Sequence, residues 1–296
     1  MLPIKRPLFR RCEFLPIIIL VTFCVLSCTK EIELESEDSL NWIIKTGETI
    51  SNKLVVNGIE MGCQGMAIND KVMYLLYDTG ICQSIDISDI NNPIPLNVFK
   101  LGSYRGDNHC NSAQFYYENN VSYLYVAGCN KKCYVEKIEA DTSSLVQTIT
   151  VSLDKYSMDY NVICGDNNSI VAFGGEIPQG SIYLFKFRRP SVCEGDVTLT
   201  DGDLIGFWEI ESNYVYSERW WQGGKYYNNM LYFVFGTVSK GKELIIYNTK
   251  TSRISNRLLF DNIMNEEPED CELYGDRIVV SLNNGKGYYL VDSPVF

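Results

Sequence analysis

Four carboxylate residues lie in different copies of a repeated pattern along the chain, at Asp107, Asp159, Glu218 and Asp270. Two carboxyl groups facing each other across a cleft can hydrolyse a glycosidic bond, one as the acid and the other as base or nucleophile. The four residues are therefore candidates for catalysis in a glycan-active hydrolase. In a chain with 37 Asp and Glu, acids on loops are also expected without any catalytic role.

A second set of side chains near the same positions could bind a ligand. It combines amides, an acid, the single histidine and two adjacent tryptophans: Gln64, His109, Asn111, Asn161, Trp220, Trp221, Gln222 and Asp270. Amides and acids form hydrogen bonds with hydroxyl groups, and aromatic rings can stack on sugars or peptide side chains. Because an amide or acid begins every copy of the pattern, these side chains could instead tie neighbouring units of the fold together.

The sequence contains no strong signal for a metal or a cofactor, and we expect neither. His109 is the only histidine, which excludes zinc sites built from several histidines unless cysteines join it. Cys110 follows His109 directly, so the two side chains would point to opposite faces of a strand. We therefore expect His109 to form hydrogen bonds at the rim of a site.

The candidate residues are positioned by a pattern that occurs five times: a short strand, a polar turn, a second apolar strand and, in most copies, a glycine. The copies begin at Gln64, Asn111, Asn161, Gln222 and Asp270, which are 47, 50, 61 and 48 residues apart. Repeats of this length with several strands are typical of a β-propeller. The sequence therefore predicts an all-β propeller of five four-stranded blades, with the candidate residues around the mouth of its central channel.

Further strands follow the repeated pair in each unit. Alternating apolar side chains predict them at 81–87, 96–101, 133–138, 145–151, 182–187, 204–210, 243–247, 254–260 and 287–291. The fifth unit lacks an outer strand, so we expect residues 42–44 or 54–56 to close the ring by completing that blade. The alternative is six blades, if the segment 188–203 contains additional strands.

The first 27 residues resemble a bacterial lipoprotein signal peptide. Four Lys and Arg residues within 5–11 precede an apolar run at 14–25, which is short for a membrane span. The sequence Val25-Leu26-Ser27-Cys28 resembles a lipobox, which implies that Cys28 is acylated and becomes the mature N-terminus. The alternatives are an ordinary cleaved signal or an uncleaved anchor.

Residues 28–41 are predicted to be an acidic tether before a propeller domain at 42–296. Thr29 and the acids after it resemble the start of outer-membrane lipoproteins that reach the cell surface, although the tract could be a mere spacer. Without the leader, the chain has 22 Lys and Arg against 36 Asp and Glu, a net charge of −14. This charge repels nucleic acid. We expect a monomeric domain that meets the membrane through its lipid and binds a glycan or a protein.

Eight of the eleven cysteines lie in the predicted domain, which in an exported protein permits up to four disulfides. Cys129 and Cys133 flank a three-residue loop and are the predicted disulfide. Cys63 and Cys110 begin adjacent inner strands, and they either pair or remain buried and free.

The repeated Gln-Gly or Asn start and the apolar strand before a glycine resemble exported propellers of the YncE or quinoprotein-like type, over residues 64–291. The resemblance implies the fold and assigns no active-site residue. Five-bladed glycosidases also resemble this plan, but they usually have a carboxylate where this chain has Gln64. We therefore expect a surface lipoprotein that binds its ligand without catalysis, with a hydrolase or a scaffold subunit of a surface complex as alternatives.

Overall fold

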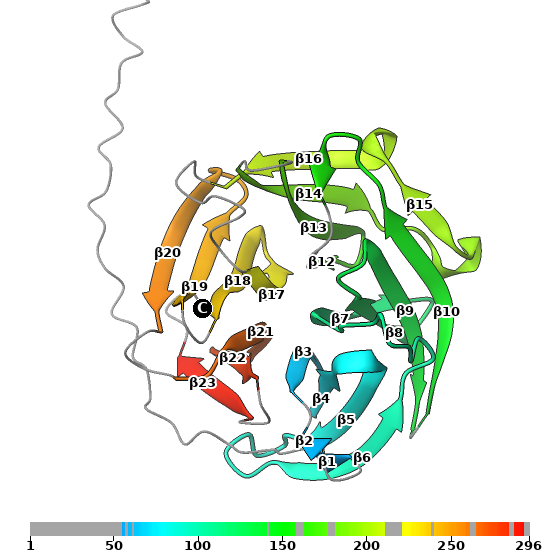
Figure 1. Cartoon of the computed structure of the whole chain (residues 1–296), viewed down its shortest axis with the longest axis vertical. Helices are drawn as coiled ribbons and strands as arrows, with labels where there is room; N and C mark the ends of the chain where they lie inside the picture. The colour runs from blue at the N-terminus through cyan, green and yellow to red at the C-terminus, as the bar shows by residue number, and fades with distance from the viewer. Residues whose placement is uncertain are drawn as a thin grey trace, which may run out of the picture. The chain divides into compact units, whose positions relative to one another are not determined.

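The computed structural model describes residues 55–56, 59–60, 62–140, 142–157, 163–176, 181–210, 221–237, 240–260, 265–283 and 287–292. All of them belong to one compact unit, Leu40–Phe296. Its sheets follow one another in chain order around a central axis (Figure 1). The fold is an all-β propeller with five blades, which confirms the predicted architecture.

The first two blades have four consecutive strands each. Blade 1 contains β3 (Cys63–Asn69), β4 (Val72–Tyr77), β5 (Ile81–Asp86) and β6 (Ile94–Lys100). Blade 2 contains β7 (Ser112–Glu118), β8 (Val121–Ala127), β9 (Lys132–Glu139) and β10 (Thr142–Val151). These bounds fall within a few residues of the strands that alternation predicts.

The remaining blades follow the same plan. Blade 3 contains β12 (Ile163–Asp166), β13 (Ser169–Glu176), β14 (Ile182–Arg188) and β16 (Leu204–Glu209), and β11 (Tyr156–Ser157) extends its inner edge. Blade 4 contains β17 (Trp221–Tyr227), β18 (Met230–Thr237), β19 (Lys240–Asn248) and β20 (Arg253–Leu259). Blade 5 contains β21 (Pro268–Tyr274), β22 (Arg277–Leu282) and β23 (Tyr288–Asp292). The inner strands β3, β7, β12, β17 and β21 surround the axis, and each contacts its neighbours (Figure 1).

Tight two-residue turns fix the register of the inner hairpins. Asn119-Asn120 and Asn228-Asn229 have positive φ at both residues, between 48° and 64°. Two such residues in a row form the turn whose twist matches that of paired strands, and asparagine tolerates this conformation well. The flanking residues Glu118 and Val121 are therefore paired directly.

The hydrophobic core lies between the blades. Tyr125 and Ile149 of blade 2 pack with Phe185 of blade 3, and Phe173 of blade 3 packs with Phe233 of blade 4. Because both faces of each sheet meet a neighbour, the middle strands are buried along nearly their whole length. This packing holds the ends of the inner strands in fixed positions.

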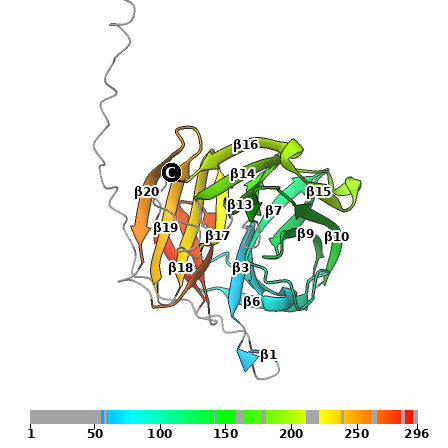
Figure 2. The ribbon, with the colours of Figure 1, turned by 45° about the horizontal axis from the view of Figure 1, so that its top comes forward.

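One candidate for ring closure lies outside blade 5. Val55–Val56 (β1) pairs with Ile59–Glu60 (β2) in a separate two-stranded sheet, and Figure 2 shows β1 below β3. Val55–Val56 therefore do not belong to the sheet of blade 5, whose described strands are β21, β22 and β23. The other candidate, 42–44, lies outside the described residues, and blade 5 has three described strands.

The segment 188–203 forms no sixth blade. It contains two short 3-10 turns, η2 (Val192–Glu194) and η3 (Asp201–Asp203), with β15 (Val197–Leu199) between them. The strand β15 pairs in parallel with β10, so it lies at the outer edge of blade 2 (Figure 1). The six-blade alternative is wrong because this excursion adds a strand to an existing blade.

Among the described residues, no helix is long and apolar enough to cross a membrane. The apolar run 14–25, Cys28 and the acidic tether lie outside the described residues.

Candidate functional site

Polar side chains from four blades converge where the inner strands begin. We call this group the mouth cluster; its members are Asp78, His109, Gln222, Glu267, Glu269 and Asn283. Asp78 Oδ1 and His109 Nδ1 are 2.5 Å apart, and Gln222 Nε2 donates to Glu267 Oε1 at 2.8 Å. Asn283 donates to Glu269 from the end of the neighbouring strand β22. These contacts join blades 1 and 2 in one pair and blades 4 and 5 in another.

The two glutamates of the cluster hold protons more tightly than ordinary glutamates do. Burial raises the pKa of Glu267, whereas the Gln222 hydrogen bond and the nearby charge of His109 act to lower it. Burial also raises the pKa of Glu269 well above its usual value, and the neighbouring charge of Glu267 adds to this effect. Within the described part of the chain, neither glutamate has a Lys or Arg ion-pair partner.

The Asp78–His109 pair forms the open side of the cluster. The side chain of His109 is 45% exposed and that of Asp78 is 46% exposed. A carboxylate at this distance from Nδ1 fixes the orientation of the imidazole ring. The other ring nitrogen of His109 is thereby available to donate a hydrogen bond, accept one, or exchange a proton with a ligand.

Backbone bulges decide which side chains face the mouth. The pairing register shifts between Cys63 and Gly65, between Trp221 and Gly224, and between Pro268 and Asp270. In a bulge, additional residues on one strand lack a direct partner and the side-chain direction changes. These irregularities occur at the mouth-side ends of three inner strands.

Asp270 lies in the joint between blades and not on the surface of the mouth. Its Oδ2 accepts hydrogen bonds from Met66 N at 2.9 Å and Ala113 N at 3.2 Å. Its Oδ1 accepts from Cys271 N at 2.8 Å and from Ser112 Oγ at 3.4 Å. Burial raises the pKa of this carboxyl, and the hydrogen bonds from the backbone amides oppose the shift. The side chain connects blades 5, 1 and 2, so a direct catalytic role does not fit its position.

Several predicted ligand-binding residues belong to the packed interior. Asn111 is buried, and its Nδ2 has no hydrogen-bond partner among the described residues. Gln64 is as buried as Gln222, and its side-chain amide lies near Asn283 of the mouth cluster. Trp221 is only 6% exposed, and its ring lies 4.7 Å from that of Phe173. Of the predicted binding residues that the structure describes, His109 and Gln222 belong to the mouth cluster.

Asp107 has no carboxylate partner in the described structure. It lies on an exposed loop, where Asn130 Nδ2 donates to its carbonyl oxygen at 3.0 Å and Arg105 Nε is 3.8 Å from its carboxylate. The other candidates Asp159, Asn161, Glu218 and Trp220 lie outside the described residues.

Asp78 and Asn283 were not among the residues that the sequence singled out. A signal for Asp78 and Asn283 exists, because both directly follow the second strand of a unit. In an antiparallel hairpin, the end of the second strand lies beside the start of the first. The connections after the second strands therefore contribute to the same mouth as the loops that enter the first strands.

The predicted disulfide between Cys129 and Cys133 is absent, and both thiols are free. Cys133 packs in the core between blades 2 and 3. Cys129 is in the loop, where burial raises the pKa of its thiol to about 12 and the charges of Glu269 and Asp78 add to the effect. The two side chains face different surroundings, which is why the short loop does not join them. Cys63 and Cys110 are likewise buried and free.

In the described part of the chain, no three His, Cys, Asp or Glu side chains are arranged to hold a metal ion. The mouth cluster offers hydrogen-bonding groups and carboxyl groups as its means of contacting a ligand.

No model of a known protein family matches the sequence, and no curated protein matches it. Among solved structures, the chain is similar to Myxococcus xanthus glutaminyl cyclase, with 10% identity, a TM-score of 0.48, and coverage of 83% of this chain and 91% of that chain. It is also similar to a GH43 glycoside hydrolase, with 10% identity, a TM-score of 0.42, and coverage of 77% and 49%. It is similar as well to Kuenenia stuttgartiensis hydrazine synthase, with 12% identity, a TM-score of 0.40, and coverage of 74% of this chain and 61% of that chain. Likenesses this distant assign no activity.

Proposed function

We propose that the protein is an exported, lipid-anchored propeller that binds a glycan or a protein partner at the mouth of its channel, without catalysis. The observation that carries this proposal is the mouth cluster itself. Asp78, His109, Gln222 and Glu267 come from four blades and meet at the same end of the channel. Convergent polar groups from separate elements are typical of sites that orient a ligand.

The chemistry of the cluster indicates what the ligand presents. Glu267 and Glu269 lie close together, and neither has a Lys or Arg ion-pair partner in the described structure. A hydroxyl-rich glycan would donate hydrogen bonds to these carboxyl groups, and an ammonium group of a protein would balance their charge. Either ligand is compatible with a chain whose overall net charge is negative.

Binding at the mouth is tested by Glu267→Gln and His109→Asn in the full-length protein, probed on a glycan array and a peptide array. Each substitution removes a hydrogen-bonding or charged group from the cluster, so we expect affinity for the bound probes to fall about five- to tenfold. Asp276→Asn is the matched control, because Asp276 is exposed at the turn at the opposite end of β21. If both mouth variants bind as the wild type does, the mouth is not the binding surface and the scaffold alternative gains support.

The lipid anchor is tested separately by Cys28→Ala and cell fractionation. The proposal rests on the lipobox-like sequence Val25-Leu26-Ser27-Cys28 after a basic, apolar leader. We expect the variant to lose membrane association, because no thiol remains for acylation. Unchanged membrane association, in cells where a known lipoprotein is fractionated in parallel, would contradict this localisation.

A glycan-active hydrolase is the second candidate, and one observation favours it. Asp78 orients His109, while the nearby Glu267 has a raised pKa. A carboxylate-held imidazole and a carboxyl group that retains its proton are the usual components of acid–base catalysis. In this case, glycans that bind on the array would also be cleaved, and Glu267→Gln would reduce cleavage far more than binding.

A further inference from the structure

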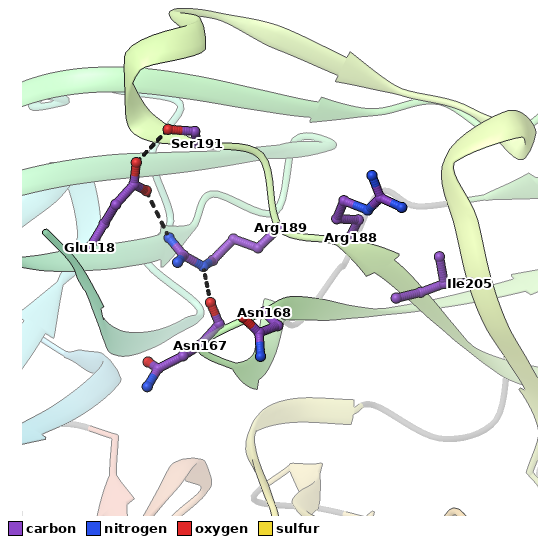
Figure 3. Close-up of a pocket in the computed structure, with 7 residues that line it drawn as sticks. All are labelled: Glu118, Asn167, Asn168, Arg188, Arg189, Ser191 and Ile205. Atoms are coloured by element: carbon purple, nitrogen blue, oxygen red, sulfur yellow. Dashed lines mark hydrogen bonds and ion pairs between the residues drawn. The ribbon is translucent and has the colours of Figure 1, made fainter.

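A cavity separate from the mouth lies between blades 2 and 3, at the opposite end of the inner strands. Its volume is about 500 Å³. The lining side chains come from the turns after β7 and β12, the end of β14 and the start of β16: Glu118, Asn167, Asn168, Arg188, Arg189, Ser191 and Ile205 (Figure 3).

Arg189 and Glu118 form a rigid and electrically balanced floor for this cavity. Arg189 Nη1 lies 3.3 Å from Glu118 Oε2 and donates to the hydroxyl of Tyr125 at 2.9 Å. Its Nε donates to the carbonyl of Asn167 at 2.9 Å, and its side chain is only 9% exposed. Ser191 Oγ also donates to Glu118. These contacts use the charges of both residues, so neither is available to a ligand.

Arg188 provides a positive charge that the described residues do not balance. Arg188 is the last residue of β14, and successive side chains of a strand point to opposite faces. Its side chain therefore points away from Arg189 and toward the side where Ile205 lies (Figure 3). Arg188 is exposed and has no hydrogen bond or ion pair within the described structure, and the side-chain amides of Asn167 and Asn168 have none either. The nearby Asp166 carboxylate pairs with Lys186 at 3.5 Å.

An apolar surface adjoins this cationic group. Ile205 is 55% exposed in the wall of the cavity. Ile205 lies at a register shift in the pairing of β16 with β14, where Lys186 pairs with Gly206 and Phe187 pairs with Leu204. An exposed cation next to an exposed apolar side chain matches a ligand that has both an anionic and an apolar part.

We propose that this cavity binds a small amphipathic anion, with a carboxylate or phosphate group on Arg188 and an apolar body against Ile205. A guanidinium can donate two parallel hydrogen bonds to either oxyanion. Asn167 and Asn168 supply additional donors beside it. The volume lies within the range of small-molecule sites, which is about 300–1,000 Å³. This site is independent of the proposed ligand at the mouth.

The proposal is tested by titrating the full-length protein with phenyl phosphate, benzoate and inorganic phosphate while recording the side-chain amide signals of Asn167 and Asn168 by NMR. We expect saturable shifts with at least one aromatic anion and weaker binding as salt is added. The variant Arg188→Gln should weaken binding about tenfold. Ile205→Ser should weaken binding of the aromatic anions and leave that of inorganic phosphate unchanged.

Arg253→Gln is the matched control, because it removes an exposed arginine from blade 4. Both Arg188 and Ile205 are exposed, so their variants should melt at the wild-type temperature. Equal binding by Arg188→Gln and the wild type would overturn the proposal. So would an equal loss in Arg253→Gln, or the absence of saturable shifts up to about 10 mM of each probe. Stronger binding of benzoate or of phenyl phosphate identifies which oxyanion the site prefers.

Discussion

Replacing Asp270 with alanine is expected to lower the free energy of unfolding by about 2–4 kcal/mol. The carboxylate accepts hydrogen bonds from the backbone amides of Met66 in blade 1 and Ala113 in blade 2, and it is fully buried. Alanine leaves both amides without a partner in a site that excludes water, and each unsatisfied buried donor costs about 1–3 kcal/mol. Removing a buried carboxyl group offsets part of this loss.

The measurement is urea unfolding of the full-length protein, compared through the midpoint at a constant slope. Asp276→Ala removes the same functional group from an exposed turn of the same blade, and we expect it to change stability by less than about 0.5 kcal/mol. Equal midpoints for the two variants would show that the Asp270 hydrogen bonds do not hold the three blades together.

Gly223→Ala is expected to destabilise the protein by about 1–3 kcal/mol or more. A Cβ at position 223 would lie 2.0 Å from Asp270 Oδ1 and 2.2 Å from its Cγ. Contacts this short force the inner strands of blades 4 and 5 apart, or they displace the Asp270 carboxylate from the backbone amides that donate hydrogen bonds to it. The effect thus acts on the same joint between blades as Asp270→Ala.

Gly106→Ala is the control for this substitution, because its added Cβ would meet no atom within 4 Å. Thermal unfolding of both variants should show a lower melting temperature for Gly223→Ala alone. Because residues 223 and 270 are in contact, the double variant Gly223→Ala/Asp270→Ala should lose less stability than the sum of the losses in Gly223→Ala and Asp270→Ala. Strict additivity would contradict a shared joint.

Local sequence determined the main strands of the blades and the number of blades. The strands predicted at 81–87 and 243–247 match β5 and β19, whose residues are buried on both faces because each sheet packs between two neighbouring blades. The Asn119-Asn120 turn fixes its hairpin through its own backbone preference. Five repeats of this local information are sufficient to predict five blades.

The Gln-Gly pairs at 64–65 and 222–223 are visible in the sequence, but the sequence does not show why a glycine is needed at these positions. A Cβ on Gly65 would lie 2.3 Å from the carbonyl oxygen of Cys110, just as one on Gly223 would meet Asp270. Both glycines therefore permit close approach of the next inner strand. That approach becomes visible only when adjacent blades are assembled.

Tertiary structure decided which polar side chains form a site. Glu269 and Asp270 are adjacent in sequence, yet Glu269 contacts Asn283 at the mouth and Asp270 binds amides about 160 and 200 residues away in the chain. The bulge between Pro268 and Asp270 separates their roles, and simple alternation does not predict such an irregularity. The Asp78–His109 pair likewise exists because two loops from different blades meet when the blades pack side by side.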